Sequence, residues 1–205
     1  LNYARTLCET GQYVRCISLL KNIEVLPNEG AYAGRGIYRE AYLNLAIDHI
    51  NKHEKKKALK SINESKVWIE NLGVGKPYDD IIDYRLEYFL EAQVATPGKA
   101  KDLLQRIAYT EKDRTEFEST DLLSVLALRL LGKEKEADEW VALWKKDNTN
   151  TIKKWCITVY EKKEDQADLL LTKYSGIRET TPWENSLVDL NFKLITKMKM
   201  LFSPE

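Results

Sequence analysis

The sequence predicts an all-α protein, in which about five helix pairs stack into a right-handed α-α superhelix and one further helix caps the C-terminal end. Apolar residues recur every three to four positions, which is the period of a helix and not of a strand. Nine glycines and five prolines make up about 7% of the chain against a usual ~12%, so turns are few and helices are long. An irregular α-helical bundle is the alternative to a regular stack.

Composition limits the classes of function. The chain has 205 residues, 32 basic and 32 acidic side chains, and 43% hydrophobic residues, which is enough apolar material to bury a core and too little net charge for wholesale disorder. A pI near 7.0 lacks the basic excess of a general nucleic-acid binder. No stretch approaches the ~20 apolar residues of a transmembrane helix. We therefore expect neither a nucleic acid nor a membrane as partner.

One order of residue types returns along the chain. A first helix carries aromatic and small residues on one face, a short turn follows, and a small residue near the start of a second helix lets the two helices approach closely. Gly11 and Gly132 are the expected turn residues of two such pairs. The small residues are Cys16, Ala58, Ala100, Ala137 and Ala167. The sequence therefore predicts one solenoid domain over 1–205, with helix pairs at 1–27, 37–68, 81–107, 118–147 and 150–174.

The second helix pair carries the clearest pattern. It reads Tyr42-x2-Leu45-Ala46-x2-His49, and then Ala58-Leu59-x2-Ile62-x2-Ser65. This pattern resembles the tetratricopeptide repeat (TPR), a helix–turn–helix unit of about 34 residues. The small residues of successive pairs lie 42, 42, 37 and 30 positions apart, and we assign the excess to two inserted loops, 27–36 and 70–78. In the second loop Gly73 and Gly75 permit positive φ, and Tyr78 is expected to contact the next helix.

The last segment, 182–202, is predicted to be a single capping helix. Pro182 suits a first helical turn. The apolar stripe of this helix consists of Trp183, Leu187, Leu190, Leu194, Met198 and Leu201. A terminal helix that covers the open face of the last repeat is what such arrays require.

A second, narrower resemblance concerns two short stretches. The segments 34–42 (GRGIYREAY) and 70–78 (ENLGVGKPY) are similar to the C-terminal repeat region of large multidomain proteins from Bacteroidetes-type bacteria, which carry an N-terminal domain of unknown function. This resemblance implies a bacterial appendage to another domain and implies no activity. The chain begins without Met or a targeting signal, so we interpret it as a fragment of a larger protein and leave open whether it is cytoplasmic or periplasmic.

No motif in the sequence predicts catalysis. His49 and His53 lie one helical turn apart, as in a zinc-metalloprotease helix, but the text between them lacks the glutamate base and no third ligand is identifiable. The loop 73–77 (GVGKP) lacks the first glycine of a phosphate loop and has Pro77 in place of Ser or Thr. The cysteines are too few for a disulfide framework, and we expect them to be buried: Cys8, Cys16 and Cys156. We expect no enzyme activity, cofactor or metal; a metal or catalytic site at the two histidines is the alternative.

The TPR resemblance implies that the first helices of the pairs line a concave groove. Carried over in this register, the expected groove residues are Arg5, Glu9, Glu40, Asn51, Arg85, Phe89, Gln93, Arg129 and Tyr160, together with Leu43, Ile47, Leu122, Leu126 and Ile152. This mixture lacks a dense basic clamp for an acidic C-terminus and fits an apolar or mixed segment. The sequence predicts a monomeric interaction scaffold that holds a protein or peptide. The alternative is a structural appendage that packs on its parent protein's N-terminal domain.

Overall fold

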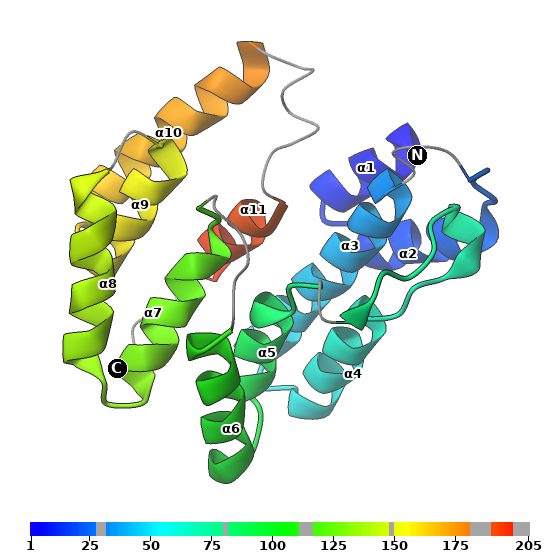
Figure 1. Ribbon diagram of the computed structural model, residues 1–205. Helices are drawn as coiled ribbons and strands as arrows, with labels where there is room; N and C mark the ends of the chain where they lie inside the picture. Colours follow the sequence, from blue (N-terminus) through cyan, green and yellow to red (C-terminus); the bar gives the residue numbers. More distant parts are fainter. Residues whose placement is uncertain (28–31, 80–81, 111–116, 148–149, 181–189, 199–205) are drawn as a thin grey trace. The chain divides into compact units, whose positions relative to one another are not determined.

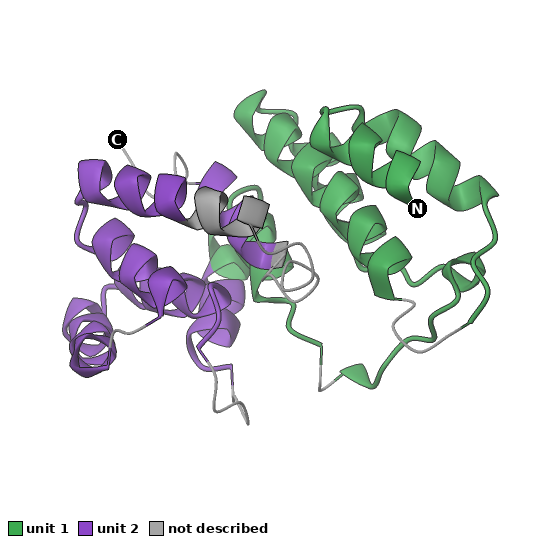
Figure 2. Ribbon diagram, turned by 90° about the horizontal axis from the view of Figure 1, so that it is seen from above, with its two compact units in different colours: residues 1–100 green, residues 101–205 purple. Residues whose placement is uncertain are grey.

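The computed structural model describes residues 1–27, 32–79, 82–110, 117–147, 150–180 and 190–198 (Figure 1). Within these ranges the regular secondary structure consists of eleven α-helices and one 3-10 turn, without a strand, which confirms the predicted all-α class. The chain divides into two compact units, residues 1–100 and 101–205 (Figure 2). The handedness of a superhelix and the prediction of one domain stay predictions.

The first unit is built around one long, central helix. Its elements are α1 (Asn2–Glu9), α2 (Tyr13–Asn22), α3 (Tyr32–Asn51), α4 (Lys55–Ser65), η1 (Glu70–Leu72) and α5 (Arg85–Ala92). Helix α3 packs against α1, α2, α4 and α5. It begins at Tyr32, which is five residues before the predicted start at 37, so the predicted loop 27–36 is too long. Contacts on several sides explain why residues all around α3 are buried, Tyr38, Ala41 and Leu43 among them.

The second unit contains the later helices. They are α7 (Thr120–Leu130), α8 (Glu134–Lys146), α9 (Thr151–Tyr160), α10 (Glu164–Thr180) and α11 (Leu190–Lys197). Helix α7 packs against α8, α9 and α11, and α9 packs against α10. The ring of Phe192 in α11 meets the buried ring of Trp155 in α9 edge to face, with centroids 4.8 Å apart. The described part of the predicted capping helix therefore covers α7 and α9, and the remainder of 182–202 lies outside the described residues.

Four of the five helix pairs are joined by the same turn. The residue two positions beyond the first helix has a left-handed backbone, with φ of 77° at Gly11, 57° at His53, 73° at Gly132 and 58° at Lys162. The following N–H donates to a carbonyl five residues back, for example Gln12 N to Leu7 O at 2.8 Å and Lys133 N to Leu128 O at 2.9 Å. This is the Schellman arrangement, which satisfies helix carbonyls that otherwise lack partners.

The same register places a small residue at the start of each second helix. Five positions after the left-handed residue stand Cys16, Ala58, Ala137 and Ala167, and all four side chains are completely buried. A small side chain there lets the second helix pack closely on the first. The left-handed turn residue and the small residue therefore keep one spacing in four pairs.

The third pair departs from this pattern. Helix α6 (Pro97–Ala108) lies across the division between the units, and it follows α5 through Thr96 and Pro97 without a left-handed residue. Ala100, at the small position, is only partly buried. The C-terminal end of α6 is tied to α7 by Ser124, whose hydroxyl donates to Ile107 O at 3.0 Å.

The predicted loop 70–78 packs on the end of α2. The Asn71 side-chain amide donates to Leu20 O at 2.8 Å and to Ile23 O at 2.6 Å, so it caps that helix. Gly73 has φ of 72°, and a Cβ there would lie 2.5 Å from Val25 O, so no other residue fits. Tyr78 is 83% exposed, and the expectation that it contacts the next helix is wrong. The loop is held from its other end, by Asn71 and the buried Leu72.

Candidate binding pocket

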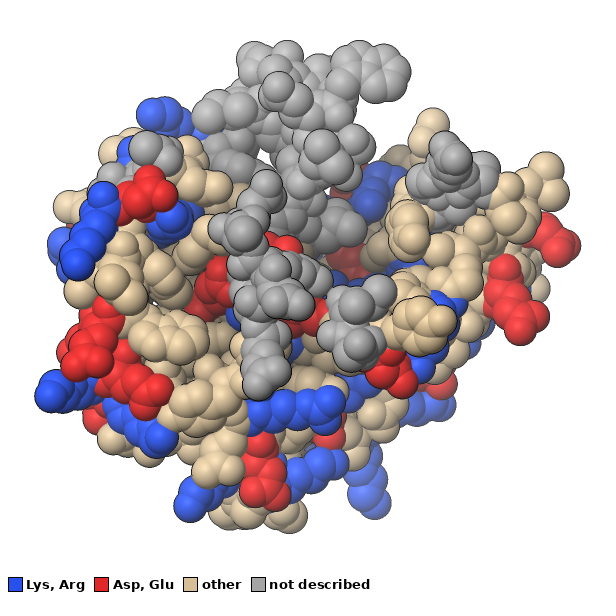
Figure 3. Space-filling view, in the orientation of Figure 1, with Lys and Arg blue, Asp and Glu red and all other residues tan. Residues whose placement is uncertain are grey.

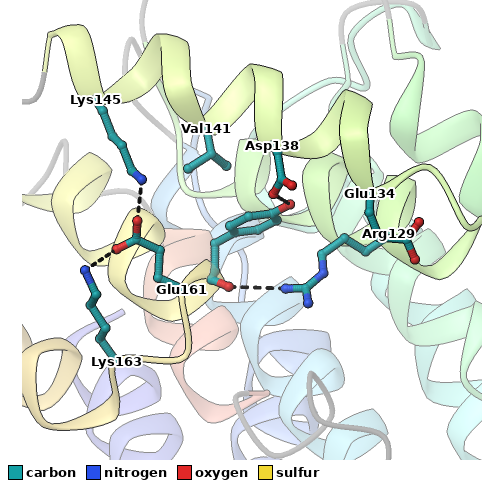
Figure 4. A pocket seen from close by; sticks show the side chains of 8 residues that line it. Arg129, Glu134, Asp138, Val141, Lys145, Glu161 and Lys163 are labelled. Atoms are coloured by element: carbon teal, nitrogen blue, oxygen red, sulfur yellow. Dashed lines mark hydrogen bonds and ion pairs between the residues drawn. The ribbon is translucent and has the colours of Figure 1, made fainter.

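The second unit contains a pocket of about 570 Å³ between the C-terminal end of α7, one side of α8 and the turn after α9 (Figure 4). Its lining residues are Arg129, Glu134, Asp138, Val141, Lys145, Tyr160, Glu161 and Lys163. Four of them project from α8 at intervals of three or four residues, so they share one helix face. The repeated turns place the ends of α7 and α9 opposite this face.

Tyr160 organises one end of the pocket. Its hydroxyl donates to Asp138 Oδ1 at 2.7 Å, and its carbonyl accepts from Arg129 Nη1 at 3.2 Å. The Arg129 guanidinium carbon also lies 4.9 Å from the Tyr160 ring centroid, in cation–π contact. Burial and the neighbouring Asp138 raise the pKa of Tyr160 well above its usual value, so the phenol stays neutral at physiological pH. Tyr160 therefore positions the charged groups around it.

Glu161 organises the other end. Its carboxylate pairs with Lys145, and its second oxygen lies 2.6 Å from Lys163 Nζ. Hydrogen bonds from Lys145 and then Lys163 lower the pKa of Glu161, so its charge persists at neutral pH. Lys145 and Lys163 are 49% and 50% exposed, which leaves both ammonium groups in reach of a ligand.

The two ends have opposite net charge. Arg129 stands against Glu134 and Asp138 at one end, which gives an excess of one negative charge. Lys145 and Lys163 stand against Glu161 at the other end, which gives an excess of one positive charge. Figure 4 shows Val141 between the two groups on α8. The lining thus combines a short apolar floor with a separation of charge.

The lining consists of six charged side chains, one tyrosine and one valine. None of the eight residues is a Ser, Cys or His. In the part of the chain that the structure describes, no group of three His, Cys, Asp or Glu side chains is placed to hold a metal ion. His49 instead bonds Glu54 through Nδ1 at 2.6 Å, and His53 occupies the left-handed turn position between α3 and α4.

Two of the predicted groove residues, Arg129 and Tyr160, meet in this pocket. Two others, Arg5 and Glu40, form an ion pair in the first unit. Arg85 is buried and pairs with Asp83 at 2.7 Å, and Phe89 is part of the core. Three polar residues are partly or fully exposed in α1, α3 and at the end of α5: Glu9, Asn51 and Gln93. Ile152 is partly exposed in α9. The other four are buried: Leu43, Ile47, Leu122 and Leu126. Their part in partner binding stays a prediction.

The acidic residues and lysines of the pocket were not predicted. Asp138 and Lys145 stand in the second helix of a pair, whereas the TPR register directed attention to first helices. A signal was present, since Glu134, Asp138, Val141 and Lys145 recur at helical spacing on α8. Only the fold shows that this face meets the end of α9.

A second set of charges joins helices in the first unit. Arg39 donates from Nε and Nη2 to the two oxygens of the buried Glu87, at 2.6 and 2.7 Å. Arg35, also buried, donates to Ser65 O at 2.6 Å at the end of α4 and stacks 4.7 Å from the Trp68 ring centroid. These contacts link α3 to α4 and α5. We assign them to folding, because each contact ties α3 to a neighbouring helix.

Comparison with models of protein families, with curated proteins and with solved structures finds no match. Among the described helices, none has the length and apolar character needed to cross a bilayer.

Proposed function

We propose that this protein is a non-catalytic interaction scaffold of TPR-like architecture, a right-handed superhelix that binds a protein or peptide segment. One observation carries the proposal. Helix pairs that share one turn and one small-residue position present a pocket of about 570 Å³, and its lining comes from two successive pairs, α7–α8 and α9–α10. That volume lies within the ~300–1,000 Å³ of ligand pockets, which is enough for a few side chains of a peptide.

Charge balance supports a peptide over a polyanion. Cations and anions are equal in number in the pocket lining, and the face shown in Figure 3 intermixes both signs without a broad basic region. A nucleic acid or polyphosphate favours concentrated positive charge. Polypeptides carry both signs together with apolar side chains, and this mixture is what the pocket offers.

The test is a selection of binders from a random peptide display library against the full chain. The proposal expects enriched sequences with measurable affinity in solution. They should bind the double variant Lys145→Glu/Lys163→Glu at least tenfold more weakly. The matched control is Lys135→Glu/Lys154→Glu, which changes the net charge equally at exposed positions outside the pocket. A selection that enriches no sequence, repeated with libraries of extended and helical peptides, would contradict the proposal.

A second candidate function is a structural appendage of a longer parent protein. It is favoured by exposed apolar residues on the first unit, including Leu1, Leu26 and Tyr32. The Leu1 and Leu72 side chains both lie next to Gly34, and the Leu26 carbonyl lies next to Gly73, which follows Leu72 in the chain. Leu1 and Leu26 therefore belong to one region. Tyrosine labelling of the isolated chain and of the parent protein tests this function: protection of Tyr32 only in the parent supports it, and equal labelling contradicts it.

A further inference from the structure

The pocket on α8 has a polarity that defines the chemistry of its ligand. We propose that it binds an extended peptide segment in which a basic and an acidic side chain flank an apolar one, in the pattern basic-x-apolar-x-acidic or its reverse. This inference rests on the proposed function, because it specifies the ligand of the same pocket. The basic side chain lies at the Glu134–Asp138 end and the acidic side chain at the Lys145–Lys163 end.

The spacing follows from helix geometry. Asp138 and Glu134 precede Lys145 by seven and eleven residues on one helix. At a rise of about 1.5 Å per residue, these intervals correspond to about 10 and 16 Å along the helix axis. An extended peptide advances about 3.3 Å per residue, so side chains four residues apart are separated by about 13 Å and point to the same face. The residue midway between them points to that face as well, opposite Val141.

The existing contacts leave charge available at both ends. Asp138 accepts one hydrogen bond from Tyr160 through Oδ1, and a carboxylate accepts several. Glu134 is exposed at the rim. At the other end Glu161 holds Lys145 and Lys163 side by side, and each half-exposed ammonium has three donors of which a carboxylate ligand needs only one.

A ligand of uniform charge fits this pocket poorly. A dibasic segment would place one cation beside Lys145 and Lys163, and a diacidic segment would place one anion beside Glu134 and Asp138. Like charges brought together at an interface are a strong source of discrimination. The pocket therefore selects against both classes, and the arrangement of charge, more than the total charge, identifies the ligand.

The experiment titrates the full chain with three capped synthetic peptides and follows backbone amide signals by NMR, which detects weak binding. The peptides are lysine-serine-leucine-serine-glutamate, the same sequence with lysine at both ends, and the same sequence with glutamate at both ends. We expect the first peptide to bind at least tenfold more tightly than the other two. When this peptide binds, the amide signals of residues 129–163 of the protein should shift. Equal binding of the three, or binding of none, would overturn the inference.

A charge-swapped variant makes the test reciprocal. In Lys145→Glu/Lys163→Glu the whole pocket becomes acidic, so the preferred ligand should change from the mixed peptide to the dibasic one. Lys135→Glu/Lys154→Glu, with the same net charge, should keep the original preference. Circular dichroism of both variants confirms that they are folded. If both variants change preference together, only the overall charge matters and the inference is wrong. Display binders that map outside the pocket would leave the scaffold function standing without this ligand.

Discussion

A buried ion pair connects two helices of the first unit. Glu87 is completely buried in α5 and has both oxygens occupied by the fork of Arg39 from α3. Two charges removed from water are tolerated only when their geometry is complementary, so each partner depends on the other. The pair is therefore sensitive to loss of one member and less sensitive to loss of both.

Replacing Arg39 alone should be strongly destabilising. Arg39→Met leaves the Glu87 carboxylate buried without its main partner, which costs on the order of 3 kcal/mol of unfolding free energy. The double change Arg39→Met/Glu87→Leu should recover most of that loss. Urea unfolding followed by circular dichroism measures both variants. Equal destabilisation by the single and double changes would show that the pair is not coupled.

The two ion pairs of Glu91 predict that the stability of the fold falls at acidic pH. Burial alone would raise its pKa, but hydrogen bonds from Lys99 at 2.7 Å and Lys66 at 3.0 Å outweigh burial and hold the pKa below the usual 4.5. Because the folded state releases this proton more readily, the stabilisation is complete above about pH 5 and is lost as the pH falls through the folded pKa. Glu91→Gln should flatten the decline in urea midpoint between pH 5 and about 3. Parallel pH profiles for the two proteins would contradict the assignment.

One turn geometry recurs in four helix pairs of the chain. Gly11 and Gly132 adopt left-handed backbone without cost, whereas His53 and Lys162 adopt it with a Cβ. A side chain in this conformation costs roughly 1 kcal/mol or more. The four turns therefore differ in strain while sharing one geometry.

Exchanging residues between these turns tests the shared geometry. Lys162→Gly should raise the unfolding free energy by about 0.5–1 kcal/mol, and Gly132→Lys should lower it by about 1 kcal/mol. A Cβ at Gly132 meets nothing within 4 Å, so backbone conformation alone should set the effect. Thermal unfolding of the two variants measures the shifts, which should have opposite signs. Shifts of the same sign would show that the turns are not equivalent.

The small residue after each turn allows a second matched comparison. Ala137 is completely buried, so Ala137→Leu should overpack the α7–α8 contact and cost about 1–3 kcal/mol. Ala100 occupies the same position in the departing third pair but is partly exposed, so Ala100→Leu should cost much less. Calorimetry distinguishes the two. A larger loss at Ala100 would contradict the assigned register.

Helix pairs and their turns were predictable because they depend on local chemistry. A glycine between two periodic segments indicates a Schellman turn, and the prediction of Gly11 and Gly132 as turn residues is confirmed. The left-handed turns at His53 and Lys162 could not be predicted in this way, because neither residue is a glycine. The start of α3 was missed because the contacts of Gly34 with Leu1 and Leu72 are remote in sequence. For the same reason the sequence did not predict the pocket, although two of its lining residues, Arg129 and Tyr160, were expected in the groove.

At the scale of the whole chain, we expect the stability of each helix to depend mainly on the helices that it contacts. Within each unit the helices pack mainly on helices that lie close in the sequence, α1–α5 in the first unit and α7–α10 in the second, which is typical of repeat arrays. Within the second unit, α11 covers α7 and the ring of Trp155. Loss of α11 should therefore affect its own unit first.

Truncation tests this locality. Deleting residues 182–205 exposes Trp155 and one side of α7, so amide hydrogen exchange should accelerate in α7, α9 and α10. The first unit, residues 1–100, should keep its protection. The full-length chain under the same conditions is the reference. Equal acceleration in both units would indicate one cooperative domain in place of a nearest-neighbour stack.

As a peptide-binding repeat scaffold, this chain is proposed to hold its ligand in the pocket between α7, α8 and α9. Amide hydrogen exchange of the full chain, with and without a display-selected peptide, measures where the ligand binds. We expect exchange to slow in residues 129–163 and to remain unchanged there in Lys145→Glu/Lys163→Glu. Slowing confined to residues 1–100, or slowing that persists in the variant, would contradict the claim.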